Sequence, residues 1–428
     1  MQKILYPPKN QWSQLLERPD NGLEDVYDTA RGVLDDVQRN GDAALIKYTS
    51  IFDGVQLSQL QVSQEEVDEA CMQVSCNLKD AILVAKKNIE IFHQAQKQQR
   101  EVVETMPGVQ CWQKSVAIEK VGLYIPGGTA PLFSTVLMLG IPAQIAGCKE
   151  VVLCTPANKE GKVDPAILYA ASLVEVSRIY KLGGIQAIGA MAYGTETVPS
   201  VAKIFGPGNR FVTAAKQLVS LKDVAIDMPA GPSEVMVMAD ESADAAFIAS
   251  DLLSQAEHGA DSQVIFVTNN ENMLREVEEE VEKQLEELPR KEIAKKALDN
   301  SRLIVLNDAD EMLDMCNQYA PEHLIISMRD DELIGNKVVN AGSVFLGNYS
   351  PESAGDYASG TNHTLPTHGY ANAFSGVNLD SYMKKITFQK ISAFGLAKLG
   401  PSIEIMAEAE QLMAHKNAVT VRLKKMNV

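Results

Sequence analysis

The spacing of apolar residues along the chain changes near residue 117. Before that point, apolar residues recur every three or four positions, which predicts helices over residues 21–38, 43–52 and 65–97. Residues 106–114 are predicted to be extended. His93 lies in a Gln- and Lys-rich part of the third helix, so we expect its side chain to be exposed. The first hundred residues are therefore predicted to be mainly helical.

After residue 117, short apolar strands alternate with helices, and this alternation predicts parallel sheets with crossover helices. The predicted strands cover residues 118–125, 151–155, 178–181, 203–205, 234–238, 263–268, 302–306, 323–327 and 343–346. The predicted helices cover residues 132–146, 165–174, 185–193, 243–256 and 271–288. The last fifty residues or so, from Ser381, are predicted to form a mainly helical tail. The fold class is α/β, with two Rossmann-like parallel-sheet domains and helical segments at both ends.

Glycine-rich loops follow several predicted strands. PGGTAP, LGGIQAIG and GPGN fall within residues 126–209. Small molecules bind at the carboxyl ends of strands in open α/β sheets, so these loops predict a ligand site. However, no complete GxGxxG motif is present, and in the nearest match Asn209 follows Gly206-Pro207-Gly208. Dinucleotide binding and ordinary turns both remain open on this pattern.

Two segments carry candidate metal ligands. Gln255 and His258 would lie one turn apart if their helix continues, but an amide oxygen is an uncommon zinc ligand, and a plain helix end is the alternative. Asp356 and His363 fall in a polar, glycine-punctuated segment without helical or strand periodicity. Such loops are often functional, and Asp356 could complete a site of nitrogen and oxygen ligands, whereas His363 could contact a substrate.

Two further segments carry candidate acid–base groups. Glu322 and His323 open an apolar run, where a carboxylate beside an imidazole offers two groups for proton transfer. An ordinary exposed Glu-His pair is the alternative. Glu410 and His415 would lie on roughly opposite sides of a continuous helix, so they can face one ligand only if the helix bends.

Composition narrows the class of protein. The chain has 428 residues, of which 46% are hydrophobic and 22% charged, as in a soluble globular protein of two or three domains. Its 39 basic and 56 acidic residues give a net charge of −17, which disfavours nucleic acid as a partner. Much of the negative charge lies between residues 276 and 287, as in a solvated helix face. No apolar run reaches the roughly 18 residues of a membrane span.

The six cysteines include no CxxC pair, which favours free thiols in a reducing cytoplasm. Cys111 and Cys154 could act as nucleophiles in an aldehyde-oxidising enzyme, but no activating histidine lies nearby in the sequence.

Taken together, several long segments resemble the histidinol dehydrogenase family. The matching segments occur in the family's order between residues 121 and 419. They are VGLYIPGGTAPLFSTVLML, KIFGPGNRFV, AIDMPAGPSEV, DLLSQAEHG, YAPEHL, GSVFLG, SPESAGDYASGTNHTLPT and AHKNAV. So many motifs together are far more specific than any one of them alone.

The resemblance implies a zinc enzyme that oxidises L-histidinol to L-histidine through bound L-histidinal, with two molecules of NAD, in the last step of histidine biosynthesis. It implies catalytic Glu322 and His323. It implies zinc ligands at Gln255, His258, Asp356 and His415. Substrate contacts are implied at Ser233, Gln255, His258, His323, Asp356, His363, Glu410 and His415, and NAD contacts at Tyr124, Gln186 and Asn209.

The resemblance also implies an organisation. The expected parts are an N-terminal segment (1–20), a first α/β domain with the zinc and catalytic residues (21–120 with 233–380), an NAD-binding Rossmann-like domain (121–232) and a helical tail (381–428). A cytoplasmic homodimer with swapped tails is expected, so that each active site is shared between chains. Neither nucleic acid nor membrane is an expected partner. The alternatives are a dehydrogenase of another small alcohol, a zinc hydrolase in which Glu322 activates water, and a protein that keeps the fold without catalysis.

Overall fold

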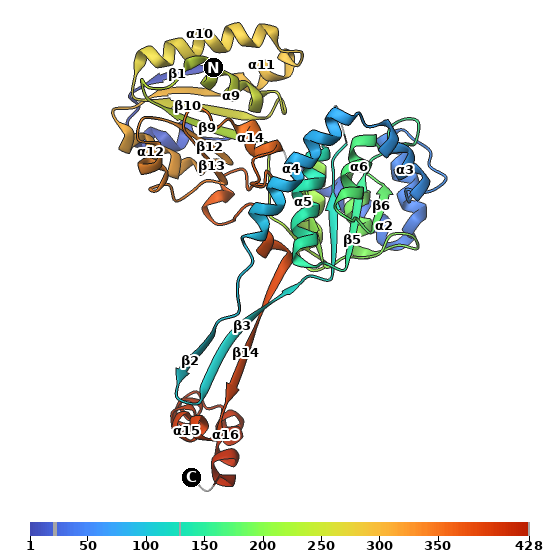
Figure 1. The fold of residues 1–428 in the computed structure, drawn as a ribbon, viewed down its shortest axis with the longest axis vertical. Helices are drawn as coiled ribbons and strands as arrows, with labels where there is room; N and C mark the ends of the chain where they lie inside the picture. Colours follow the sequence, from blue (N-terminus) through green and yellow to red (C-terminus); the bar gives the residue numbers. More distant parts are fainter. Residues whose placement is uncertain (20–23, 128–129, 427–428) are drawn as a thin grey trace. The chain divides into compact units, whose positions relative to one another are not determined.

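The computed structural model describes residues 1–19, 24–127 and 130–426 (Figure 1). Gly128 and Thr129 of the PGGTAP loop lie outside the described residues. The chain divides into two compact units. The first consists of Met1–Ala95 and Ile118–Tyr382, and the second of Gln96–Ala117 and Met383–Val428.

The first unit contains a six-stranded parallel sheet in the order β1-β11-β10-β9-β12-β13. Its strands are β1 (Gln2–Leu5), β9 (Glu234–Ala239), β10 (Gln263–Thr268), β11 (Arg302–Val305), β12 (His323–Ser327) and β13 (Ser343–Leu346). Central strands β9 and β10 are buried along their whole length, because helices cover both faces of the sheet.

Alternate strand residues face opposite sides of this sheet. One face packs against α9 (Ala245–Ala256), α10 (Glu271–Glu287) and α11 (Lys291–Asp299), which lie above the sheet in Figure 1. The other face packs against α12 (Ala309–Tyr319) and α1 (Trp12–Leu15), next to the short η1 (Lys9–Gln11). Two short helices, α13 (Asp331–Gly335) and α14 (Glu352–Tyr357), lie on either side of β13 in the sequence.

The same unit holds a five-stranded parallel sheet in the order β6-β5-β4-β7-β8. Its strands are β4 (Lys120–Tyr124), β5 (Glu150–Thr155), β6 (Arg178–Lys181), β7 (Lys203–Phe205) and β8 (Ala225–Ile226). One face packs against α3 (Gln64–Gln73), α4 (Cys76–Gln94), α5 (Phe133–Ala146) and α6 (Pro165–Leu173). The other packs against α2 (Glu24–Tyr48), α7 (Gly184–Tyr193) and α8 (Arg210–Ser220).

Helices α2, α3 and α4 of the N-terminal region thus pack on the five-stranded sheet. A single predicted helix over 65–97 is two helices, because the Ser75 side chain accepts a hydrogen bond from the Leu78 N–H and caps α4. α2 continues into a π-helical turn, η2 (Thr49–Asp53). The expectation that His93 is exposed is wrong. Its side chain is fully buried, with Nδ1 2.9 Å from the Ile89 carbonyl oxygen.

The second unit is an antiparallel sheet in the order β14-β3-β2 with two helices. Its strands are β2 (Val102–Met106), β3 (Val109–Ala117) and β14 (Met383–Ile391), and its helices are α15 (Ala393–Ala409) and α16 (Met413–Lys425). The α/β fold class is confirmed, but the tail is not helical throughout, because β14 pairs with β3 over nine residues. Two short 3₁₀ turns, η3 (Tyr370–Asn372) and η4 (Leu379–Tyr382), precede it in the first unit.

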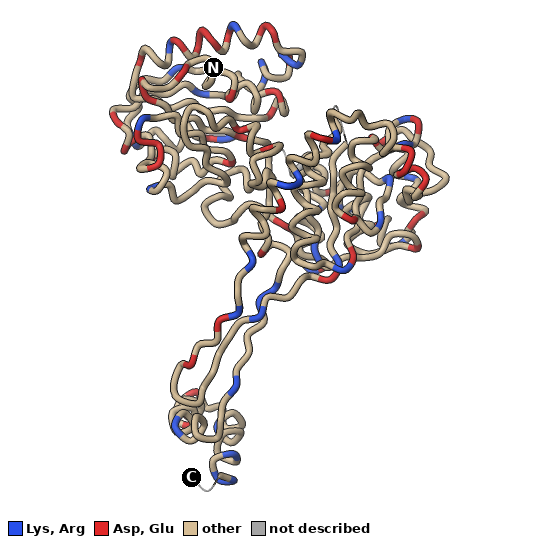
Figure 2. Tube along the Cα trace, viewed as in Figure 1, with Lys and Arg blue, Asp and Glu red and all other residues tan. Residues whose placement is uncertain are grey.

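Acidic residues gather along α10 (Figure 2), where Glu276, Glu279 and Glu282 leave the apolar Val277 and Val281 to pack on the sheet. This agrees with a solvated helix face. Among the described residues, no helix has both the length and the apolar character needed to cross a membrane.

Candidate active site

The residues predicted to catalyse proton transfer, Glu322 and His323, lie at the amino end of β12, next to β9. His323 is the first residue of β12 and is in register with Val235 of β9 and Ser343 of β13. Glu322 precedes it, and both side chains are buried. The chain reaches them from α12 through Ala320, which has a left-handed φ of 52°. This end of the six-stranded sheet is opposite to the one that the carboxyl-end rule predicts.

Three carboxylates surround the His323 imidazole. Its Nδ1 lies 3.7 Å from Glu322 Oε2 and 3.8 Å from Glu352 Oε1, and its Nε2 lies 3.5 Å from Asp356 Oδ1. Neither ring nitrogen has a hydrogen-bond partner among the described residues. An imidazole with free nitrogens beside several carboxylates is able to accept and release protons.

Burial and charge act in opposite directions on His323. Burial alone would lower its pKa, but the carboxylates of Glu352, Glu322 and Asp356 outweigh burial and raise the pKa to about 10. Burial raises the pKa of Glu322 to about 8, against the opposing influence of His323. Burial also raises the pKa of Glu352 well above its usual range. Burial would raise the pKa of Asp356, but the interaction with His323 at 3.5 Å outweighs burial and lowers the pKa.

The same cluster offers ligand atoms for a metal ion. Ligand atoms of His258, Glu352 and Asp356 all lie within 4.8 Å of one another. His258 is exposed and lies just beyond the end of α9, whereas Gln255 is buried inside that helix. With its amide oriented to satisfy its neighbours, Gln255 donates a hydrogen bond to Glu352. It also accepts one at 2.8 Å from the Glu234 N–H, which is shared with Glu322 Oε2 at 2.9 Å. The structure thus brings Gln255, His258 and Asp356 to one place.

His363 lies against the same cluster. Its Nδ1 is 2.9 Å from the Asp356 carbonyl oxygen, and its Nε2 is 3.1 Å from Thr135 Oγ1 on α5. Burial lowers the pKa of His363, so the ring favours its neutral form. Ser233 is half-buried directly before β9. Two of the predicted substrate contacts, Ser233 and His363, therefore lie near the amino ends of β9 and β12.

The three residues predicted to bind NAD lie at the carboxyl ends of strands in the five-stranded sheet. Tyr124 ends β4, and its hydroxyl accepts a hydrogen bond from the Gly184 N–H at 3.1 Å. Gln186 is buried in the first turn of α7, where Nε2 donates to Asp53 at 3.3 Å and Oε1 has no partner among the described residues. Asn209 is exposed and caps α8 by accepting hydrogen bonds from the N–H groups of Phe211 and Val212.

Glu410 and His415 belong to the second unit, and both are exposed there. α15 ends at Ala409, Gln411 has a left-handed φ of 60°, and α16 begins at Met413. The chain therefore does bend between Glu410 and His415, as a shared ligand would require.

Sequence reasoning missed Glu352, Glu234 and Thr135. Glu352 is 1% exposed and shares α14 with Asp356 four residues later, so both carboxylates lie on one helix face. That spacing within SPESAGD was the available signal. Glu234, the first residue of β9, and Thr135 lie within segments that resemble the family, but the sequence assigns them no role, because their importance comes from contacts with distant segments.

The cysteines do not form an alternative nucleophilic centre in the first unit. Cys154 is fully buried in β5, and burial raises the pKa of its thiol far above the usual range. A thiol in that environment is a poor nucleophile. Cys111 lies on β3 of the second unit.

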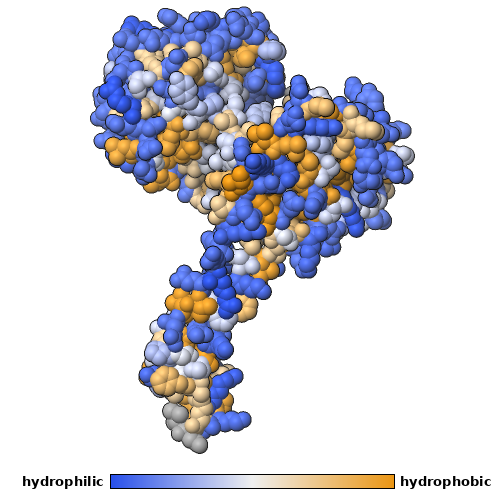
Figure 3. All heavy atoms as spheres, in the orientation of Figure 1, coloured by the Kyte–Doolittle hydropathy of each residue, from blue (hydrophilic) through white to orange (hydrophobic). Residues whose placement is uncertain are grey.

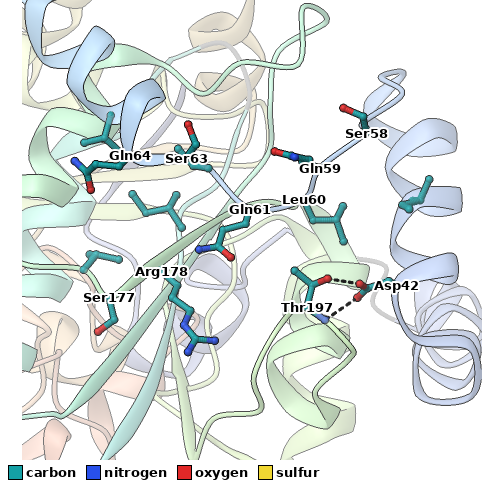
Figure 4. Close-up of a pocket in the computed structure, with 15 residues that line it drawn as sticks. Asp42, Ser58, Gln59, Leu60, Gln61, Ser63, Gln64, Ser177, Arg178 and Thr197 are labelled. Carbon is teal, nitrogen blue, oxygen red and sulfur yellow. Dashed lines mark hydrogen bonds between the residues drawn. The ribbon is translucent and has the colours of Figure 1, made fainter.

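A separate cavity of about 640 Å³ lies beside the edge strand β6 in the first unit (Figure 4). Arg178, the 58–64 segment and Thr197 contribute to its lining. Asp42 also lines it, but its carboxylate already accepts hydrogen bonds from Thr195 and Thr197. None of the predicted site residues lines this cavity.

Comparisons with known proteins identify the family of this chain. The profile of the histidinol dehydrogenase family matches residues 16–423. A histidinol dehydrogenase of Bacteroides fragilis is 61% identical over 425 residues, which is 99% of each chain. The chain belongs to the histidinol dehydrogenase family. This confirms the resemblance and makes the protein an oxidoreductase of that family.

Two further members of the histidinol dehydrogenase family are similar to this chain. The Escherichia coli K12 protein is 54% identical over 416 residues, covering 96% of this chain and 95% of its own. The crystal structure of histidinol dehydrogenase from Elizabethkingia anophelis superposes with a TM-score of 0.98 at 56% identity, over 100% of this chain and 99% of that one.

Proposed function

We propose that the protein oxidises L-histidinol to L-histidine through bound L-histidinal, a four-electron reaction that requires NAD and zinc and completes histidine biosynthesis. One observation carries this proposal. The buried Glu322 and His323 pair adjoins a group of potential metal ligands, in a member of the histidinol dehydrogenase family.

The residues fit zinc in their chemistry. Zinc binds imidazole nitrogen and carboxylate oxygen, and His258 and Asp356 supply both in one cluster. We propose Gln255, His258, Asp356 and His415 as the ligands, with Glu352 beside them. When bound, zinc would orient the substrate's imidazole and amine and would offset nearby negative charge.

The residues near the five-stranded sheet fit a dinucleotide. The unpartnered Oε1 of buried Gln186, the hydroxyl of Tyr124 and the exposed Asn209 at the start of α8 all lie at carboxyl ends of strands. Bound NAD would accept the hydride in each of the two oxidations.

His323 acts as the base in the first oxidation. It takes the hydroxyl proton of histidinol as the carbon gives up hydride, which leaves the aldehyde. Glu322 then takes a proton from the water that adds to the aldehyde carbon, and His323 gives its proton to the aldehyde oxygen, so that the hydrate forms. His323, neutral again, takes a hydroxyl proton of the hydrate as the second hydride leaves for NAD, and the product is the acid. Both groups lie at one strand end, so a retained aldehyde can meet them in turn.

A bound cation would make the neutral, proton-accepting form of His323 available at neutral pH. The carboxylates of Glu352, Glu322 and Asp356 raise the pKa of His323 to about 10, so in their field the ring holds its proton at neutral pH. A cationic substrate or metal beside these carboxylates would bring the pKa of His323 down toward neutrality.

Ser233, His363 and Glu410 are proposed to bind the substrate, together with Gln255, His258, His323, Asp356 and His415.

The second unit supports a homodimer with swapped tails. Its surface shows hydrophobic residues among hydrophilic ones (Figure 3), and several large apolar side chains are exposed. They include Ile386, Phe394, Ile405, Met406 and Met413. We propose that this surface packs on a second copy of the chain and supplies Glu410 and His415 to the partner's active site. We also propose a cytoplasmic location, in line with the six unpaired cysteines.

An absorbance assay tests the activity. Purified protein is mixed with L-histidinol and NAD, with and without a chelator, and NADH and histidine are quantified. Two NADH per histidine, lost with the chelator and restored by zinc, is the expected result. One NADH per histidinol, with histidinal accumulating, would contradict the four-electron reaction. No NADH at all would contradict the dehydrogenase assignment.

A further inference from the structure

A buried ionic network lies behind Glu322, and the proposed mechanism does not use it. Arg18 Nε donates a hydrogen bond to Glu234 Oε2 at 2.6 Å, and Arg18 Nη2 donates to Oε1 at 3.2 Å. The Tyr319 hydroxyl donates to Oε2 at 2.7 Å. The side chains of Arg18 and Glu234 are 16% and 3% exposed, and Tyr319 is 1% exposed. These three residues come from the N-terminal segment, β9 and α12.

Each oxygen of the Glu234 carboxylate accepts two hydrogen bonds. Oε2 accepts from Arg18 and Tyr319, and Oε1 accepts from Arg18 and from the main-chain N–H of His368 at 2.6 Å. A buried ion pair is costly unless its geometry is good and its remaining hydrogen bonds are made, and both conditions hold here. The network is therefore rigid enough to fix the segments that it joins.

The network fixes the segment that leads to Glu322. Arg18 Nη2 donates to the Tyr319 carbonyl oxygen at 2.7 Å, and the guanidinium lies 4.0 Å from the centre of the Tyr319 ring. From Tyr319 the chain passes through Ala320, with its left-handed φ, and Pro321 directly into Glu322. Two residues therefore separate the anchored Tyr319 from the proposed water-activating carboxylate.

The network also fixes the carboxylate itself. The main-chain N–H of Glu234 donates to Glu322 Oε2 at 2.9 Å. Glu234 is thus held through its side chain by Arg18 and Tyr319, and it holds Glu322 through its main chain. Displacing the Glu234 side chain would shift both the N–H that orients Glu322 and the segment on which Glu322 is carried.

We propose that Arg18, Glu234 and Tyr319 are positioning residues that orient the Glu322 carboxylate toward the water that adds to the bound aldehyde. This inference rests on the proposed function. It predicts that damage to the network slows the oxidation of histidinal, which needs activated water. The interconversion of histidinol and histidinal, which needs His323 and no water, should be spared.

The experiment measures the two half-reactions separately in the zinc-loaded enzyme. NAD-dependent oxidation of histidinal reports the water-requiring half, and NADH-dependent reduction of histidinal reports the other half in reverse. Tyr319→Phe removes one donor to Glu234 and keeps the ring. We expect the kcat for histidinal oxidation to fall about tenfold and that for reduction to change less than about twofold, in line with the sensitivity of catalysis to small misplacements.

Arg18 provides a second variant and a rescue. Arg18→Met should lower the ratio of histidinal oxidation to histidinal reduction further than Tyr319→Phe does. Arg18→Lys should bring this ratio part of the way back to the wild-type value, because lysine keeps the positive charge but lacks the two-pronged guanidinium group. Val281→Ala is the matched control, because it shortens a buried side chain that packs on the same sheet without touching the network. It should lower Tm and leave the ratio unchanged.

Two results would overturn the inference. The first is an equal fall in kcat for histidinal oxidation and histidinal reduction in Tyr319→Phe and Arg18→Met. That result would mean that the network contributes only to the stability of the fold. The second is an unchanged ratio in folded variants. If the wild-type enzyme fails to oxidise histidinal, the proposed function is wrong, and the inference is overturned with it.

Discussion

The Nε2 atom of His323 lies 3.5 Å from Oδ1 of Asp356, although the two residues belong to different elements, β12 and α14. On the other side of the ring, Nδ1 faces Glu322 and Glu352 at 3.7 and 3.8 Å. His323 therefore connects the proposed metal ligands to the proposed water-activating carboxylate. The predictions below separate these roles.

Glu322 and His323 should divide the two half-reactions. His323→Ala should slow both by about a hundredfold or more, because each needs a base. Glu322→Gln should slow histidinal oxidation by a similar factor and histidinol oxidation by less than about threefold, because water is activated only in the second half. Stopped-flow NADH formation from each substrate measures both. An equal loss in the two halves of Glu322→Gln would contradict its role.

Loss of a metal ligand should lower bound zinc and activity together. His258→Asn removes an imidazole from the cluster with Glu352 and Asp356. Mutation of a residue that only hydrogen-bonds to a metal ligand already lowers metal affinity about 10–100-fold. Loss of a ligand itself should therefore lower zinc affinity at least about tenfold. Elemental analysis after dialysis measures occupancy, with the exposed His368→Asn as control. Full zinc occupancy in His258→Asn would require a different ligand set.

The stability of the metal-free protein should fall as pH rises from about 5 to 8. Burial raises the pKa of Glu322 to about 8, so between its ordinary value near 4.5 and 8 the folded protein holds a proton that the unfolded chain has released. His323 acts in the same direction, because its pKa is raised to about 10 and its stabilising effect is lost as pH rises from about 6.5.

Glu322→Gln isolates the carboxyl contribution, because glutamine cannot titrate. Thermal unfolding with a chelator at pH 5 and pH 8 should show a smaller decrease of Tm in Glu322→Gln than in the wild type, by about 3 °C or more. Equal decreases in the two proteins would mean that Glu322 does not carry a raised pKa.

The proposed tail exchange predicts complementation between inactive chains. His323→Ala and His415→Ala chains are unfolded together and refolded. If the second unit serves the partner's site, one site of each mixed dimer carries both defects and the other carries none. Activity should then return to about half of the wild-type value per mixed dimer, by counting sites. Refolded single variants are the controls. Verified mixed dimers without activity would place Glu410 and His415 in the site of their own chain.

The sequence by itself determined most strands of the two parallel sheets, but it did not predict the edge strands β1 and β8. Strands 178–181, 203–205, 263–268 and 323–327 agree with the structure, because continuous apolar runs between turn residues depend on neighbours a few positions away. It also determined the family, since many long motifs occur together. The contact between Gln255, His258 and Asp356 was predicted only through that resemblance.

Tertiary structure decided the rest. β12 lies beside β9, although 83 residues separate the end of β9 at Ala239 from the start of β12 at His323. This strand order brings Glu322 to the Glu234 N–H. Tertiary structure also placed Glu322 and His323 at the amino end of β12 and buried Glu352 beside His323. It paired β14 with β3. Each of these features depends on contacts between residues that lie far apart in the sequence. The spacing of apolar residues predicts which face of a helix or strand is buried, but it does not predict which element packs against that face.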